Sequence, residues 1–116
     1  MSKAKGKSSI PDDVLSLYDK LVKTNPRIER KGATMPYTSI NGHMFSFLDK
    51  HGAMGLRLPE QERNDFLKRY KTKLFVAHGV VLKEYVAVPG KLLKETKRLQ
   101  RYFKISFAYT KSLKPK

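Results

Sequence analysis

The sequence predicts a single α+β domain, in which an antiparallel sheet of about five strands (a meander plus a hairpin) is flanked by N-terminal, middle and C-terminal helices. Three observations predict this class. Apolar residues recur at helical spacing in three segments, they alternate with period two in the segments between, and glycine-containing turns join the alternating segments. A chain of 116 residues is long enough for one core and too short for two. We expect this domain over residues 11–116, after a flexible basic tail over residues 1–10.

The first helix is predicted to begin in the segment SSIPDD and to end before TNP. Ser9 is a candidate N-cap, Pro11 suits the first turn, and the two aspartates that follow complement the positive end of the helix dipole. Pro26 disfavours the helical conformation at the residue before it, so the helix should stop there. The apolar face comprises Val14, Leu15, Tyr18, Leu21 and Val22.

Three strands are predicted from the segments ATMPYTSING, HMFSFLD and AMGLRL, in which the period changes to two. Asn41-Gly42 tolerates the positive φ angles of a tight hairpin turn, and Gly52 suits the next reversal. In the second of these strands we expect one face to carry Met44, Ser46 and Leu48 and the other to carry Phe45 and Phe47.

The second half of the chain predicts a helix, a hairpin and a final helix. The segment LPEQERNDFLKRYKT is acidic at its start and basic at its end, as the helix dipole favours. Two further strands in KLFVAHGVVLKEYVAVPG should reverse near His78-Gly79. The last helix should begin at about Lys91 and break near Ile105, because ISFAYT also alternates as a strand would.

The chain is strongly basic. Twenty-five Lys and Arg residues against ten Asp and Glu give a formal net charge of +15, of which residues 1–10 contribute +3 and residues 91–116 contribute +8. Such a field attracts phosphates, acidic proteins and anionic lipid surfaces, and it also favours solubility. No apolar run approaches the roughly 20 residues of a membrane span, no secretory signal is evident, and cysteine is absent. We expect a cytoplasmic protein with no membrane partner.

The stretch GHMFSFLDKHGAMGLRLP is the part of the sequence that most resembles an active site. A metal site needs three or four ligands converging on one point. His43 begins a strand and His51 lies in the next turn, so the two lie at opposite ends of a hairpin, and His78 belongs to a different turn. Most carboxylates fall on helices where solvent can reach them, and no phosphate loop is present. We therefore expect no metal, no cofactor, no catalytic residue and no enzymatic activity.

The remaining candidate is a nucleic-acid-binding surface of basic side chains. The last helix turns a row of cations away from its apolar face, and a second cluster follows the first helix. We expect salt-sensitive contact with phosphates and weak sequence preference. The candidate residues are Arg27, Arg30, Lys31, Lys94, Lys97, Arg98, Arg101 and Lys104.

Two long segments also carry a family resemblance. ERKGATMPYTSINGHMFSFLDKHGAMGLRLPEQERNDFLKRY and HGVVLKEYVAVPGKLLKETKRLQRYFKISFAYTKSLKPK resemble the N-terminal domain of the TfoX/Sxy competence-regulator family, from about Leu15 to Leu113. The marks are NGHMFSF, GLRLP before a helix containing ER, and KEYVAVP before the last helix. MmcQ/YjbR-like proteins, with an implied DNA-binding role, are similar in outline.

The resemblance implies a compact α+β domain in a bacterial cytoplasmic protein, linked to the regulation of natural competence. It brings no catalytic residues to this chain. Full-length members of the family carry a second, C-terminal helical domain, and this sequence ends at Lys116 without one.

Three functions stay open on the sequence alone. The first is a binding domain for nucleic acid or for a nucleic-acid-bound protein. The second is a protein-interaction module or homodimer that pairs through an exposed sheet edge or a Met/Phe surface. The third is a small-ligand binder or enzyme with a pocket on the sheet around Tyr37, His43 and Tyr85. Basic residues gathered on one face would favour the first function.

Overall fold

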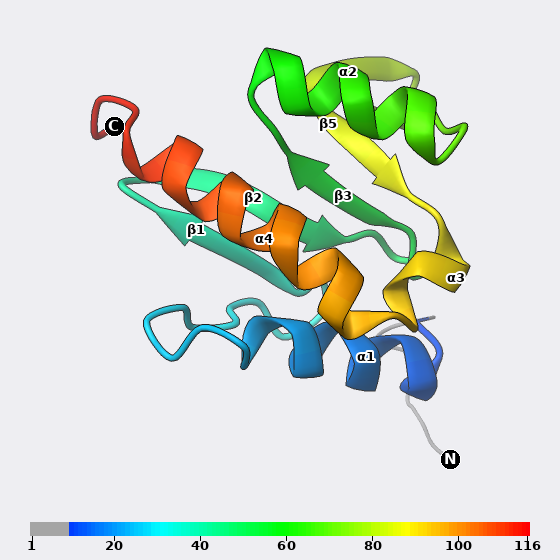
Figure 1. Cartoon of the computed structure of the whole chain (residues 1–116). Helices are drawn as coiled ribbons and strands as arrows, with labels where there is room; N and C mark the ends of the chain where they lie inside the picture. Colours follow the sequence, from blue (N-terminus) through cyan, green and yellow to red (C-terminus); the bar gives the residue numbers. More distant parts are fainter. Residues whose placement is uncertain (1–9) are drawn as a thin grey trace.

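The computed structural model describes residues 10–116, which form four helices and a five-stranded antiparallel sheet with strand order β1-β2-β3-β5-β4 (Figure 1). This confirms the predicted α+β class and the five-stranded sheet. The predicted N-cap Ser9 and residues 1–9 of the predicted tail lie outside the described residues, and Ile10 is buried in the core. The elements are α1 (Asp12–Val22), β1 (Tyr37–Ile40), β2 (His43–Leu48), β3 (Met54–Arg57), α2 (Glu60–Arg69), β4 (Leu74–Ala77), β5 (Val80–Val88), α3 (Gly90–Leu93) and α4 (Thr96–Lys111).

The core lies between the sheet and the helices on one of its faces. In Figure 1, α4 crosses in front of the sheet, α1 lies below it and α2 above it. Phe45 of β2 contacts Phe103 of α4 at 5.6 Å between ring centroids, and Phe66 of α2 contacts Tyr102 of α4 at 5.0 Å. Because α4 contacts both the sheet and α2, it is the central element of the helical layer.

The tight turns form where the sequence predicts them. Asn41 and Gly42 have φ angles of 57° and 80°, and His78 and Gly79 have φ angles of 53° and 77°. These are the left-handed conformations that a two-residue hairpin turn requires. His78 is therefore a turn residue between β4 and β5.

A β-bulge in β2 makes one prediction wrong. Thr38 of β1 pairs with Ser46, but the next residue of β1 pairs with Met44, so Phe45 is the extra residue. The bulge interrupts the alternation of side chains. Phe45 therefore packs under α4, whereas Phe47 lies against Phe75 and Tyr85 of the other hairpin. The two phenylalanines do not share a face.

The last helix also differs from its prediction. The break lies at Lys94 and Glu95, between the single turn of α3 and the long α4, and α4 continues through Ile105 without interruption. Glu95 has φ −103° and ψ 71°, outside the helical region. The segment ISFAYT stays helical because residues at helical spacing are buried against the sheet and α1; the buried residues of α4 are Leu99, Tyr102, Phe103, Ser106 and Thr110.

No helix among residues 10–116 combines the length and the apolar character that crossing a membrane requires.

Candidate nucleic-acid interface

The N-terminal end of α4 carries cations where a helix normally carries acids. Lys97 and Arg98 occupy its first turn and Lys94 precedes it, while no acidic residue lies in that turn. By contrast, α1 and α2 both begin with two acidic residues. The start of a helix bears partial positive charge, so cations there are unfavourable for folding. The N-cap, Glu95, is the acidic residue at this helix start, and the cations that follow it are not explained by the helix dipole.

These cations line a cavity of about 1090 Å³ at the junction of α1, α2 and the α3–α4 connection. Lys20 enters from α1 and Arg69 from α2, so the chain brings six cations and one carboxylate, that of Glu95, to one hollow. A concave surface of one charge sign concentrates counter-ions of the opposite sign. We call it the basic cavity; it is lined by Lys20, Arg69, Tyr70, Lys94, Glu95, Thr96, Lys97, Arg98, Arg101 and Tyr102.

Two tyrosines form the wall of the basic cavity on the side of α2. Arg69 Nη1 donates a hydrogen bond of 3.5 Å to Tyr102 Oη, which raises the pKa of the exposed Arg69 above its ordinary value. The guanidinium of Arg101 lies 5.9 Å from the ring centre of Tyr102. Tyr70 is half-buried and packs on Tyr102, and burial raises the pKa of its hydroxyl, which stays neutral at physiological pH. The wall thus combines fixed positive charge with aromatic surface.

A smaller cavity, of about 250 Å³, lies between α4 and the segment that follows α1. Arg27 and Lys104 bring positive charge to it, and Phe103 lines it from α4. We call it the α1–α4 pocket; it is lined by Thr24, Asn25, Pro26, Arg27, Gln100, Phe103 and Lys104.

The eight predicted binding residues divide into three groups. Lys94, Lys97, Arg98 and Arg101 line the basic cavity, and Arg27 and Lys104 line the α1–α4 pocket. The remaining two are held by neighbours in the chain. Arg30 pairs with Asp19 at 2.8 Å and donates to the carbonyl of Gly32, and Lys31 donates to Ser39 at 3.1 Å.

The sequence missed three contributors to the basic cavity: Lys20, Arg69 and Tyr70. Lys20 and Arg69 lie near the C-terminal ends of their helices, where the helix dipole favours cations. Within its own helix, each cation is therefore explained by the dipole, and the sequence gives no sign of a shared site. Only the packing of α1 and α2 beside α4 turns these residues toward one hollow.

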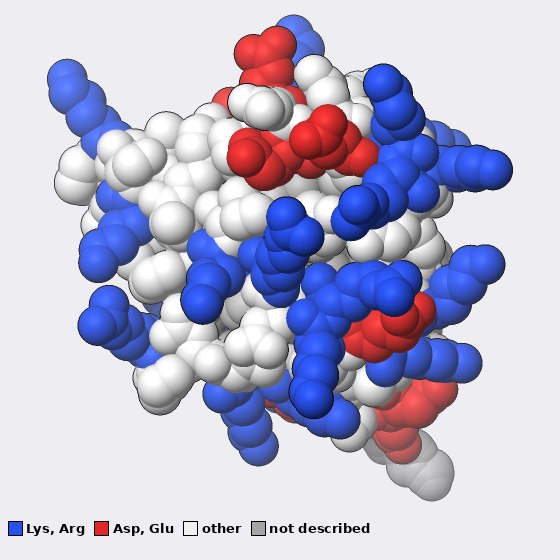
Figure 2. Space-filling view, in the orientation of Figure 1, with Lys and Arg blue, Asp and Glu red and all other residues white. Residues whose placement is uncertain are grey.

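The face that α4 crosses carries many cationic side chains. Figure 2 shows Lys and Arg side chains crowded over the middle and right of this face, with acidic side chains in its upper part and in smaller groups at the middle right and lower right. Arg98 and Glu95 form the single ion pair of this cluster that the described residues show, at 3.4 Å with both side chains at least half exposed. Such a surface pair contributes little to stability. Most of the cationic charge is thus free for an anionic partner.

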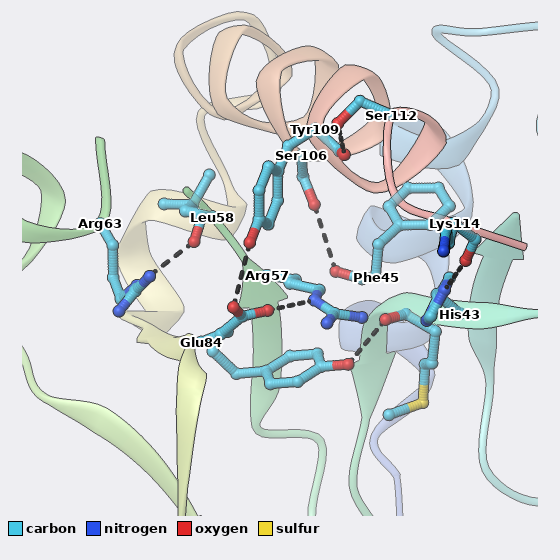
Figure 3. Close-up of polar contacts among 12 residues, drawn as sticks. His43, Phe45, Arg57, Leu58, Arg63, Glu84, Ser106, Tyr109, Ser112 and Lys114 are labelled. Atoms are coloured by element: carbon cyan, nitrogen blue, oxygen red, sulfur yellow. Dashed lines mark hydrogen bonds and ion pairs between the residues drawn. The ribbon is translucent and has the colours of Figure 1, made fainter. Parts of the chain in front are cut away.

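The region around Tyr37, His43 and Tyr85 does not coincide with any of the three cavities that lie among the helices. Tyr85 donates a 2.6 Å hydrogen bond to the carbonyl of Met44. His43 Nε2 lies 2.7 Å from the carbonyl of Lys114 (Figure 3). Both side chains therefore satisfy backbone groups. Across residues 10–116, no three His, Cys, Asp or Glu side chains converge as metal ligands would.

No protein-family model, no curated protein and no solved structure matches this chain. The resemblance to TfoX/Sxy N-terminal domains stays a prediction, and the function is inferred from the site.

Proposed function

We propose that this protein is a small, non-enzymatic binding domain that contacts the phosphates of a nucleic acid through the basic cavity. The observation that carries the proposal is the convergence of six Lys and Arg side chains on one hollow, against a single carboxylate. Phosphate contacts dominate the affinity of nucleic-acid-binding proteins and need little sequence information. The half-buried Tyr70, which packs on the buried Tyr102, adds aromatic surface against which a base can stack.

The position of the cations at the start of α4 supports this proposal over a role in solubility alone. Lysines that serve solubility can lie anywhere on the surface, and a helix start is an unfavourable place for them. A phosphate beside that helix start would interact favourably with both the cations and the helix dipole. The proposal also agrees with the DNA-binding role that the family resemblance implies.

Binding to a fluorescently labelled oligonucleotide over a salt series tests the proposal. We expect the triple variant Lys94→Glu, Arg98→Glu, Arg101→Glu to lose affinity by about 10- to 100-fold at low salt, and the logarithm of the parent's affinity to fall linearly with the logarithm of salt concentration.

A matched control carries the same change in charge elsewhere. Lys50, Lys73 and Lys83 are exposed lysines of the sheet region and its connections, outside the three cavities. Replacing these three lysines by Glu should lower the affinity for the oligonucleotide far less than the triple variant Lys94→Glu, Arg98→Glu, Arg101→Glu does. Equal losses in the two variants would mean that net charge alone drives binding, and no binding by the parent at low salt would refute the proposal.

A second candidate function, pairing with another protein chain, is favoured by the hairpin of β4 and β5. Val76, Val80 and Val81 lie on this hairpin with exposed fractions of 48%, 59% and 49%, and β4 is an edge strand of the sheet. Exposed apolar residues at a sheet edge are typical of strand-pairing surfaces. Sedimentation of the parent and of Val80→Lys at high salt tests it, because a monomeric parent would exclude homodimerisation.

A further inference from the structure

The basic cavity and the α1–α4 pocket lie on opposite sides of an exposed ridge of α4. Arg98 and Tyr102 line the cavity together with residues of α2, whereas Gln100 and Phe103 line the pocket together with the end of α1. The crest between them carries exposed cations at spacings of four and three residues, which fall on one face of a helix. These crest residues are Lys97, Arg101 and Lys104.

The ridge connects the two hollows into one cationic path. Arg101 belongs both to the crest and to the basic cavity, and Lys104 belongs both to the crest and to the α1–α4 pocket. Arg27 lies at the far end of the path, after α1. A polyanion that leaves the basic cavity over α4 therefore meets positive charge along the whole way.

The other way out of the basic cavity is less favourable for a polyanion. The groove that continues between α2 and α4 shares Arg69 and Arg101 with the basic cavity, and beyond them it carries Lys68 together with two carboxylates, Glu62 and Asp65. Carboxylates repel phosphates at short range. The two carboxylates offset most of the positive charge of this groove, whereas the residues that line the α1–α4 pocket include two cations and no carboxylate, so the way toward α1 is the more favourable one.

The surface dips at the basic cavity, rises at the α4 ridge and dips again at the α1–α4 pocket, and this shape suits a flexible nucleic acid better than a rigid one. A double helix is stiff over about 150 base pairs and presents a convex surface, so it would rest on the ridge and leave the hollows unfilled. A single strand can bend into both hollows and place a base against the half-buried Tyr70.

We infer that the protein binds one single strand of nucleic acid along this bent path, from the basic cavity over the α4 ridge to the α1–α4 pocket. The inference rests on the proposed function and adds the strand state and the footprint. It predicts that the basic cavity alone holds a short strand and that a longer strand gains affinity from Arg27 and Lys104.

The test combines strand length with two double variants. Homopolymeric single strands of about 4 and about 12 nucleotides, as DNA and as RNA, span the range of common single-strand footprints. The variant Arg27→Glu, Lys104→Glu should leave affinity for the short strand unchanged and weaken binding of the long strand about 10-fold. The variant Lys94→Glu, Arg98→Glu should weaken binding of both lengths by a similar factor.

A control variant and a duplex complete the experiment. Lys50→Glu, Lys83→Glu makes the same charge change outside the path, and it should affect the two lengths equally and weakly. A duplex of about 12 base pairs should bind the parent about 10-fold more weakly than the single strand of that length.

Failure of the inference and failure of the proposed function give different results. Binding that depends on Lys94 and Arg98 but, at both lengths, not on Arg27 and Lys104 would overturn the bent path alone. Preference for the duplex would likewise overturn the inference and leave the proposed function standing. Absence of binding to every strand and duplex at low salt would overturn both.

Discussion

Three hydroxyl groups lie in the interior of the molecule where α1 meets the sheet. Tyr18 Oη lies 2.7 Å from Ser46 Oγ, which lies 2.5 Å from Thr38 Oγ1, and all three side chains are fully buried. Burial raises the pKa of Tyr18 to about 12, although hydrogen bonds from the other two hydroxyls oppose the shift. These buried hydroxyls satisfy one another, as buried polar groups must.

The raised pKa makes the fold sensitive to alkaline pH. The Tyr18 hydroxyl ionises at about pH 10 in the unfolded chain and at about 12 in the folded one, so the unfolded state gains stability as pH rises through this window. We expect the parent to lose about 2 to 3 kcal/mol of unfolding free energy between pH 10 and pH 12 through this group. Denaturant unfolding at a series of pH values measures the loss.

Tyr18→Phe is the comparison that isolates this contribution. The variant should be less stable at neutral pH by about 1 kcal/mol, because one buried hydrogen bond is lost. Between pH 10 and pH 12 its stability should fall less steeply than that of the parent. Parallel curves for the two proteins would show that Tyr18 does not titrate in this window.

At the scale of residues, the sequence predicts apolar burial well and polar burial poorly. Tyr18, Leu21 and Val22 are buried in α1 as the helical pattern predicts. Ser46 and Thr38 are equally buried. The sequence of a strand does not predict this, because a hydroxyl group is buried only where it finds a hydrogen-bond partner. That partner, Tyr18, comes from another element and is identified only in the folded chain.

The elements are correctly predicted where local signals decide, and wrong where packing decides. The turns at Asn41 and His78 follow from residues that accept positive φ, which is a local property. The bulge at Phe45 has no such signal, because it is set by how β1 and β2 pair. The break in the last helix lies ten residues before the predicted position, since the burial of Phe103, Ser106 and Thr110 on one face keeps the segment around Ile105 helical.

One ion pair joins three elements at the end of the sheet beside the bulge. Arg57 Nε of β3 donates to Glu84 Oε1 of β5 at 2.7 Å, and Tyr109 of α4 donates to Glu84 Oε2 at 3.0 Å (Figure 3). Burial opposes the ionisation of Glu84, but the two donors and the nearby charges of Arg57 and Arg63 outweigh it and hold its pKa below the ordinary value. The C-terminal half of α4 is thereby fixed to the sheet.

Removing the charge of Glu84 should therefore weaken this junction. Because the pKa of the folded carboxyl is depressed, its contribution is complete above the ordinary value of 4.5 and is lost as pH falls through the folded value. Glu84→Gln should lower stability at pH 7 by about 1 kcal/mol.

Acid unfolding of the two proteins is the measurement. The difference in stability between the parent and Glu84→Gln should shrink as pH falls below 4.5 toward the depressed pKa of the folded carboxyl, where the parent's carboxyl becomes protonated as well. A difference that stays constant to pH 3 would mean that the shape of the side chain, rather than its charge, stabilises the junction.

At the scale of the whole molecule, the sequence predicts four of the six cations that line the basic cavity. The basic row on the last helix is visible as a pattern, and four of its residues line the basic cavity. Lys20 and Arg69 could not be assigned to it, because their distance from α4 depends on how α1 and α2 pack. Arg30 shows a contact that the sequence does not predict, since its guanidinium is paired with the carboxylate of Asp19, eleven residues earlier.

The concentration of cations beside the start of α4 should also make the free protein less stable than it could be. The charges repel one another and oppose the helix dipole, and among residues 10–116 Glu95 is the one acidic residue that lines the basic cavity with them. We expect the triple variant Lys94→Gln, Lys97→Gln, Arg98→Gln to have a Tm about 2 to 5 °C higher than the parent at low salt and to bind nucleic acid more weakly.

The control variant Lys50→Gln, Lys73→Gln, Lys83→Gln removes three separate exposed charges and should leave the Tm within about 1 °C of the parent. The gain should vanish at about 1 M salt, where the screening length is about 3 Å. If Lys94→Gln, Lys97→Gln, Arg98→Gln gains no stability at low salt, these cations do not destabilise the fold. Their placement would then no longer support a binding role.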